Sequence, residues 1–295
     1  MTDLVPKYAT LNSIIASATR DGRINSATSV IAPFQGQLDP INYLGERSTE
    51  LGRPLLGESA DADELLLRHS HFSFFGNLLS EGQEECFENG LLAGDSQSAT
   101  LKSHLLAFGA LEAETLRRCP QCVGEDVARY GRAHWRIFHQ FPIARHCVAH
   151  GCRLQTCCAA CKATIARSDR PLLPDDACEA CGHDRFSASS FKASPGYWQT
   201  LRLMNALLTC EVPRARPEMR RVIWERARDF WSRRGQFRNP YIHTLDAWKC
   251  DSIERLAKLL GCLKPGSDEQ FDITSVLTLA PTMLVAVLAT VDDVA

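Results

Sequence analysis

The chain has 295 residues, of which 45% are hydrophobic and 23% are charged. These proportions are ordinary for a soluble globular protein and exclude wholesale disorder, and the length suffices for two or three domains with buried cores. The net charge of −2 conceals a segregation of charge. Residues 1–116 hold 7 Lys/Arg against 16 Asp/Glu (−9), residues 117–170 hold 10 against 3 (+7), and residues 200–239 hold 10 against 4 (+6). Such segregation indicates either a basic surface for an anionic partner or oppositely charged parts that face each other.

The N-terminal part, residues 1–116, is predicted to be an acidic, mainly helical domain without a catalytic signature. A helical turn is expected from Leu11, with a stop at Asp21-Gly22-Arg23. Apolar residues at helical spacing predict further helices over residues 61–79 and 96–113.

A cysteine-rich stretch, residues 117–192, organises the rest of the chain. Nine of the 13 cysteines lie between positions 119 and 181, and we expect no signal peptide because the first residues lack an apolar stretch. This favours zinc-bound thiolates in a reducing cytoplasm over disulfides. The stretch contains four pairs of metal-ligand residues, each pair separated by two residues: Cys119-Pro-Gln-Cys122, Cys147-Val-Ala-His150, Cys158-Ala-Ala-Cys161 and Cys178-Glu-Ala-Cys181. This spacing lets a short turn direct both side chains at one ion, so we predict a tandem zinc-finger segment.

Sequential pairing is the simplest grouping of these ligands. It gives one site of three thiolates and one imidazole (Cys119, Cys122, Cys147, His150) and one site of four thiolates (Cys158, Cys161, Cys178, Cys181). Interleaved pairing is an alternative with longer loops, and Cys152 or Cys157 could replace an assigned ligand. His146 and His183 are expected to be surface or supporting imidazoles. Four protein ligands leave no position for a reactive water, and the chain lacks the zinc-deaminase pattern, so two structural Zn²⁺ ions are expected and a zinc enzyme is disfavoured.

Aromatic and basic residues fill the interval between the first two ligand pairs. Trp135 and Phe141 are expected in a small core above the metal. The candidate nucleic-acid or partner contacts in this segment are Arg118, Arg129, Arg132 and Arg136, because its positive charge must face something. A solvated charged surface is the alternative at each position.

The C-terminal part, residues 193–295, is predicted to be a helical domain that begins near Ser194-Pro-Gly196. A basic amphipathic helix is expected over residues 218–234, with Arg220, Arg221 and Arg228 as candidate phosphate contacts. A helix over residues 251–260 resembles the start of a helix-turn-helix but lacks a convincing recognition helix, which favours an ordinary packing helix. The apolar stretch 276–291 is too short to span a membrane, so no membrane partner is expected.

The cysteine-rich segment resembles the TniQ/TnsD family of transposition target-selection proteins. The similarity rests on 17 residues in order: Cys119, Pro120, Cys122, Glu125, Asp126, Gly131, Trp135, Arg136, His139, Gln140, Pro142, Cys147, His150, Gly151, Leu154, Cys158 and Cys161.

The resemblance implies a mainly α fold in which helical N-terminal and C-terminal parts flank small zinc-finger or zinc-ribbon elements. It implies a non-catalytic adaptor in bacterial DNA transposition, cytoplasmic and associated with the nucleoid. Such an adaptor links target DNA or an RNA-guided surveillance complex, as in CRISPR-associated transposons, to an AAA+ ATPase and a transposase. For the RNA-guided systems it also implies a homodimer. A stand-alone zinc-finger transcription regulator is the alternative, and the absence of neighbouring transposase and ATPase genes would favour it.

Overall fold

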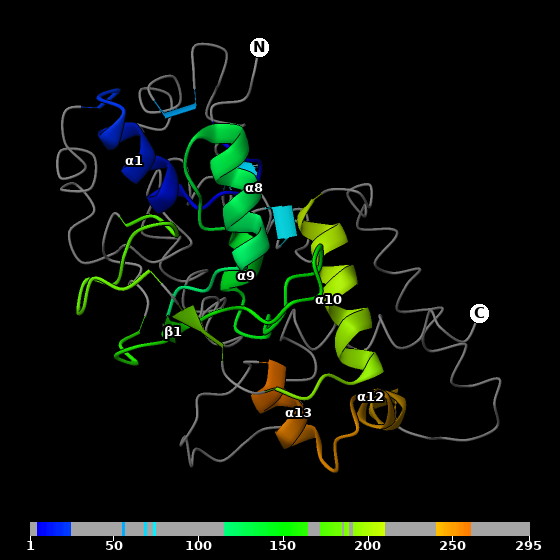
Figure 1. Cartoon of the computed structure of the whole chain (residues 1–295). Helices are drawn as coiled ribbons and strands as arrows, with labels where there is room; N and C mark the ends of the chain where they lie inside the picture. The colour runs from blue at the N-terminus through cyan, green and yellow to red at the C-terminus, as the bar shows by residue number, and fades with distance from the viewer. Residues whose placement is uncertain are drawn as a thin grey trace, which may run out of the picture.

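The computed structural model describes residues 5–24, 55–56, 68–69, 73–74, 115–164, 172–184, 186–188, 191–209 and 240–260 (Figure 1). Their helices are α1 (Leu11–Arg20), α8 (Pro120–Tyr130), α9 (Ile137–Gln140), α10 (Pro195–Leu208), α12 (Pro240–Trp248) and α13 (Ile253–Leu260). Their strands are β1 (Cys157–Cys158) and β2 (Phe186–Ser187), which pair antiparallel with Cys157 opposite Ser187 and Cys158 opposite Phe186. Helices and turns thus dominate the described part of the chain.

Helix α1 begins and ends where capping chemistry predicts. The Thr10 side chain accepts a hydrogen bond from the Ser13 N–H at 3.3 Å, which satisfies one of the free donors of the first turn. At the other end, the Asp21 N–H donates to the Ser17 carbonyl at 3.0 Å, and Gly22 follows with φ of 70°. Glycine adopts this left-handed conformation without steric cost, so the helix stops at the expected place.

The first ligand pair opens helix α8 instead of forming a separate turn. Cys119 is the N-cap of the helix, and Cys122 lies in its first turn. Pro120 occupies the first helical position, where its fixed φ suits the helix and its missing N–H costs nothing. The Cys119 sulfur caps the helix by accepting a hydrogen bond from the Cys122 N–H at 3.4 Å. The helix ends at Gly131, whose φ is 80°.

The main hydrophobic core joins the first ligand group to the C-terminal helices. It contains Cys119, Cys122 and Cys147 together with side chains of α9, α10, α12 and α13. Helix α10 packs on α12, and α12 packs on α13 (Figure 1). A methyl group at Gly196 would lie 2.8 Å from the Trp248 ring, so this crossing requires glycine. The sequence had not indicated α12.

The N-terminal segment lies against the cysteine-rich segment. The Thr10 N–H donates to the Trp135 carbonyl at 2.7 Å, and the Ile137 N–H donates to the Tyr8 carbonyl at 2.8 Å. Ser13 Oγ accepts a hydrogen bond from the Trp135 N–H at 2.9 Å. These bonds cross the predicted domain boundary at residue 116.

Several expected elements lie outside the described residues. They are the helix over 96–113, the basic helix over 218–234, the apolar stretch 276–291, and the helix over 61–79 except for residues 68–69 and 73–74. Within the described ranges, none of the helices combines the length and the apolar character that a membrane crossing needs.

Candidate metal centres

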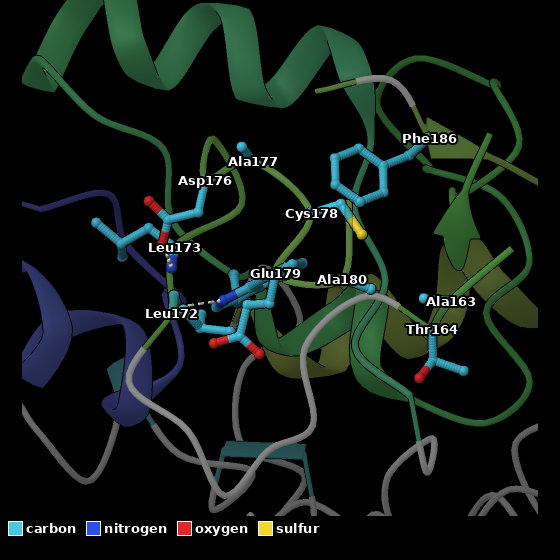
Figure 2. A pocket seen from close by; sticks show the side chains of 11 residues that line it. Ala163, Thr164, Leu172, Leu173, Asp176, Ala177, Cys178, Glu179, Ala180 and Phe186 are labelled. Atoms are coloured by element: carbon cyan, nitrogen blue, oxygen red, sulfur yellow. Dashed lines mark hydrogen bonds between the residues drawn. The ribbon is translucent and has the colours of Figure 1, made fainter. Parts of the chain in front are cut away.

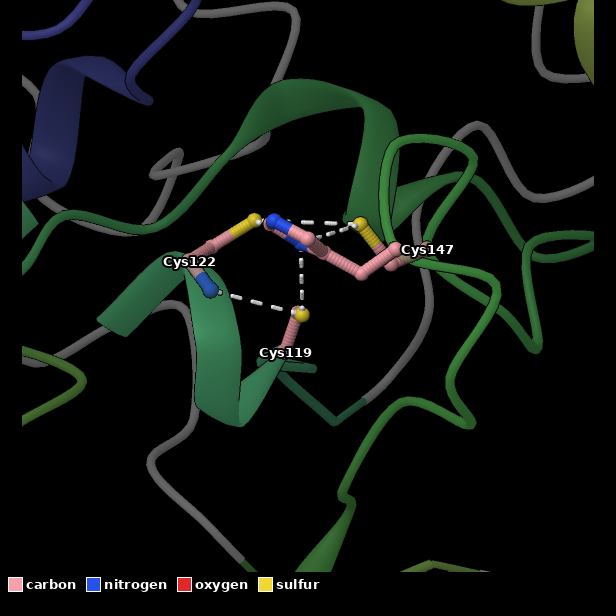
Figure 3. A group of neighbouring side chains, drawn as sticks. Cys119, Cys122 and Cys147 are labelled. Carbon is pink, nitrogen blue, oxygen red and sulfur yellow. Dashed lines mark hydrogen bonds between the residues drawn. The ribbon is translucent and has the colours of Figure 1, made fainter. Parts of the chain in front are cut away.

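The first group of ligand residues forms where the start of α8 meets the turn at residues 147–150. The sulfur atoms of Cys122 and Cys147 lie 3.7 Å apart. The His150 Nδ1 atom lies 3.3, 3.4 and 3.5 Å from the three sulfur atoms. Figure 3 shows the side chains of Cys119, Cys122 and Cys147 pointing toward one another. All four ligand atoms lie within 4.8 Å of one another, so the group could hold a metal ion.

These separations match the edges of a tetrahedral zinc site. With Zn–S bonds of about 2.3 Å and Zn–N bonds of about 2.0 Å, tetrahedral geometry requires S···S edges of about 3.7 Å and S···N edges of about 3.5 Å. The observed 3.7 Å and 3.3–3.5 Å agree with these values. The donor set of the first group therefore fits zinc.

A carboxylate on α8 orients the imidazole of the first group. The His150 Nε2 atom lies 3.0 Å from Glu125 Oε1, so its proton is donated there and the Nδ1 lone pair faces the sulfur atoms. Such second contacts are usual for metal-bound histidines. Sequence analysis matched Glu125 to the family pattern but did not predict this role, although Glu125 follows Cys122 by three residues and so shares its face of the helix.

The second group brings together the four remaining ligand cysteines. Sulfur separations of 3.6 Å join Cys158 to Cys181 and Cys161 to Cys178, again close to a tetrahedral zinc edge of about 3.7 Å. This group too could hold a metal ion. Its exposure differs from that of the first group, since Cys161 and Cys181 are exposed.

Three of the ligand turns share one backbone design. In each, the residue after the second ligand donates its N–H to the carbonyl of the first cysteine: Gly151 to Cys147 at 2.8 Å, Lys162 to Cys158 at 3.1 Å, and Gly182 to Cys178 at 2.7 Å. All three donors have φ between 63° and 71°. The left-handed residue closes the turn and aims the two ligands at one point, which is why the two-residue spacing was informative.

Backbone and thiol donors also tune the cysteines. The N–H groups of Cys161 and Ala160 lower the pKa of Cys158 to about 6, which favours the thiolate that a metal needs. In the first group, donation from the Cys122 and Cys147 thiols lowers the pKa of Cys119, and the same contact raises the pKa of Cys122.

The spare cysteines and histidines lie outside both groups. Cys157 Sγ is 3.1 Å from the Ser187 hydroxyl, and the His146 ring bonds the Tyr197 hydroxyl at 3.2 Å. The Cys152 sulfur lies 3.2 Å from the Cys119 sulfur, but Cys152 is a member of neither group. The groups that form are therefore those of sequential pairing.

Two of the predicted contact arginines form hydrogen bonds within the protein, and one of them, Arg118, is buried. Arg118 is only 8% exposed, stacks over the Phe186 ring at 3.6 Å, and donates to the carbonyls of Pro174 and Asp184. Arg136 donates to the Asp126 carboxylate and to the Lys7 carbonyl. These contacts give both residues a structural role, and the placement of Arg118 does not support it as a surface contact.

The other predicted contact residues divide between the surface and the undescribed region. Arg132 pairs with Asp21 at 2.7 Å, while Arg129 is exposed near the end of α8 with its guanidinium over the Tyr130 ring. Arg220, Arg221 and Arg228 lie outside the described residues.

Two pockets adjoin the ligand groups. One of about 120 Å³ lies beside the second group, and its lining includes Leu172, Asp176, Glu179 and Phe186 (Figure 2) as well as Trp135. Another of about 220 Å³ lies beside the first group, and both Glu125 and His150 line it.

Comparison with known proteins identifies the family. A search of curated proteins returned no match. Residues 10–154 match the TniQ family model, a span that begins at the cap of α1, includes the whole first ligand group and ends before the second. The segment that carried the sequence resemblance thus lies largely inside the match, and residues 10–154 of the chain are a domain of the TniQ family.

Proposed function

We propose that the protein is a non-catalytic target-selection adaptor in bacterial DNA transposition. The observation that carries this proposal is the TniQ match over residues 10–154, since a TniQ domain implies a transposition-associated role in target selection. In this proposal the protein links target DNA, or an RNA-guided surveillance complex, to an AAA+ ATPase and a transposase. It acts in the cytoplasm at the nucleoid, as a homodimer.

Two structural Zn²⁺ ions complete the proposed adaptor. Seven thiolates and one imidazole at tetrahedral spacing suit zinc better than magnesium or calcium, which prefer oxygen ligands. Each centre would have four protein ligands and hence no open position for a reacting water. The first ion would be a structural staple, because its ligands belong to the main core that unites α9, α10, α12 and α13.

The charges of the described region favour protein contacts over DNA reading by the zinc segment. Three of its arginines already bind groups of the same chain. Arg118 donates to the Asp184 carbonyl, and Arg132 and Arg136 pair with the carboxylates of Asp21 and Asp126. Residues 172–184, which carry half of the second ligand group, contain four acidic residues and no Lys or Arg. Such a surface repels phosphates, so we place nucleic-acid contacts on the basic stretch 218–234 and partner-protein contacts on the zinc segment.

Co-purification tests the proposal. The zinc-loaded protein is tagged and co-expressed with the AAA+ ATPase, the transposase and any guide-RNA complex encoded beside its gene. We expect stable association with the ATPase, and with the guide-RNA complex if one is present. Direct DNA reading would instead show as tight, sequence-dependent binding by the protein alone, with steep salt dependence. Autonomous operator binding without any transposition partner would refute the adaptor role.

A further inference from the structure

A sulfur atom outside the two ligand groups lies against a predicted zinc ligand. Cys152 Sγ is 3.2 Å from Cys119 Sγ. Neighbouring sulfur pairs within the groups are 3.6–3.7 Å apart, which is close to the edge of a tetrahedral zinc site. The Cys152–Cys119 distance is shorter, so these two sulfur atoms are in direct contact.

Separate pieces of backbone hold the two sulfur atoms in place. The Cys147 N–H donates to the Cys152 carbonyl at 2.8 Å, and the Gly151 N–H returns to the Cys147 carbonyl, so the turn fixes Cys152. Cys119 is fixed as the N-cap of α8. Since a disulfide bond is about 2.0 Å long, the two sulfur atoms need to approach each other by only about 1.2 Å.

The two thiols differ in access to solvent. Cys119 is 1% exposed and lies in the main core, whereas Cys152 is half-buried. A small oxidant from solvent therefore meets Cys152 first. Because Cys152 belongs to neither ligand group, no metal ion would occupy its sulfur.

We propose that Cys152 and Cys119 form an oxidation site at which a hydroperoxide converts the first metal centre into a disulfide. In the first step the Cys152 sulfur attacks the O–O bond; the thiol becomes a sulfenic acid, and the peroxide leaves as water or an alcohol. In the second step the Cys119 thiolate attacks the sulfenic sulfur, the S–S bond forms, and hydroxide leaves. Two electrons pass in total from the two sulfur atoms to the peroxide.

The disulfide removes one ligand from the first centre. Cys122, Cys147 and His150 remain, and a site with three protein ligands holds zinc less tightly than a closed one. The loss falls inside the main core, so oxidation loosens the junction between α8 and the C-terminal helices, and a thiol reductant reverses it. The inference rests on the proposed zinc site but not on the transposition role.

Disulfide mapping with parallel zinc measurement tests the proposal. Zinc-loaded full-length protein is treated with hydrogen peroxide, free thiols are alkylated, and linked peptides are identified by mass spectrometry, while a chromophoric chelator measures released zinc. We expect a Cys119–Cys152 linked peptide that appears together with zinc release and disappears with dithiothreitol. Cys152→Ser should lose this peptide and release less zinc at the same dose. Cys157→Ser is the matched control, since Cys157 is equally half-buried but contacts Ser187, and should behave as the wild type.

Three results would overturn or redirect the interpretation. A disulfide from Cys119 to Cys122 or Cys147 as the main product would show that oxidation does not use Cys152. A Cys152→Ser protein that binds one zinc ion fewer before oxidation would make Cys152 a ligand, and the proposal wrong. A wild-type protein without bound zinc would refute the zinc function instead, while the mapping would still decide whether the two thiols pair.

Discussion

Replacing Glu125 tests whether the structure places the imidazole of the first centre correctly. The His150 Nε2 proton is donated to Glu125 at 3.0 Å, which leaves Nδ1 free to face the three sulfur atoms. Glu125→Ala removes this acceptor, so the ring can rotate or change tautomer. Glu125→Gln keeps an acceptor oxygen but removes its charge.

The expected loss of zinc affinity follows from the exposure of the carboxylate. Removing such a partner lowers metal affinity by about 10–100-fold. The Glu125 side chain is 65% exposed, and water therefore screens its charge and can replace part of its hydrogen bond. We therefore expect the lower end for Glu125→Ala, about tenfold or about 1.4 kcal/mol. Glu125→Gln should lose about threefold, because a neutral acceptor makes a weaker bond than a charged one.

Replacing zinc with cobalt(II) allows metal binding to be measured separately at the two centres. A centre of three sulfurs and one nitrogen absorbs visible light at other wavelengths than a centre of four sulfurs, so competition with a chelator yields an affinity for each. Gln121→Ala is the matched control, because Gln121 is an exposed residue of the same helix, one turn before Glu125. Wild-type affinity in Glu125→Ala, or equal weakening of both centres, would refute the orientation of His150 by Glu125.

Three further predictions follow from burial and charge. Arg118→Leu should lower the free energy of unfolding by about 2–3 kcal/mol, because buried carbonyls lose their donor. The control Arg129→Ala should change it by less than about 0.5 kcal/mol. Urea titrations measure both values, and a larger effect of Arg129→Ala would contradict the structure. Burial lowers the pKa of His134 to about 4, below the ordinary 6.5. The unfolded chain therefore binds a proton at a higher pH than the folded protein does, so the free energy of unfolding is undiminished above pH 6.5 and decreases as the pH falls toward 4. His134→Phe should reduce this decrease, and an unchanged pH dependence of stability would refute the role of His134. A chelator should free the exposed Cys161 and Cys181 for alkylation before the thiols of the first centre, and simultaneous release would contradict this.

The ligand grouping was predictable because each ligand pair is formed by residues that are close together in the sequence. A cysteine followed three residues later by a second ligand needs only one turn, and the left-handed residues Gly151 and Gly182 close two of these turns. Both ends of α1, the start of α10 and the last residue of α13 were predictable for the same reason, because caps and breakers act within a few residues. The core positions of Trp135 and Phe141, each 1% exposed, followed from the need of a small metal segment for apolar filling.

Contacts between distant residues were not predictable from spacing. The bond from Thr10 to Trp135 joins residues more than 100 positions apart, and no periodicity announces it. The role of Pro120 was misjudged, because a ligand pair was expected to form a turn rather than to open a helix. Glu125 was similarly hidden, since its function depends on where the turn of His150 lies in space.

The charge segregation in the sequence indicated either a basic surface for an anionic partner or oppositely charged parts that face each other. The described contacts favour the second explanation. Arg132 pairs with Asp21, and Arg20 pairs with Asp176 at 2.5 Å, so charges from the N-terminal and cysteine-rich parts meet within the molecule. Arg136 pairs with the nearly buried carboxylate of Asp126, within the cysteine-rich segment itself. Part of the positive charge of the zinc segment is therefore paired with carboxylates of the same chain. In the proposed function, target recognition comes either from the basic stretch 218–234 or from a partner, and the co-purification experiment distinguishes these two possibilities.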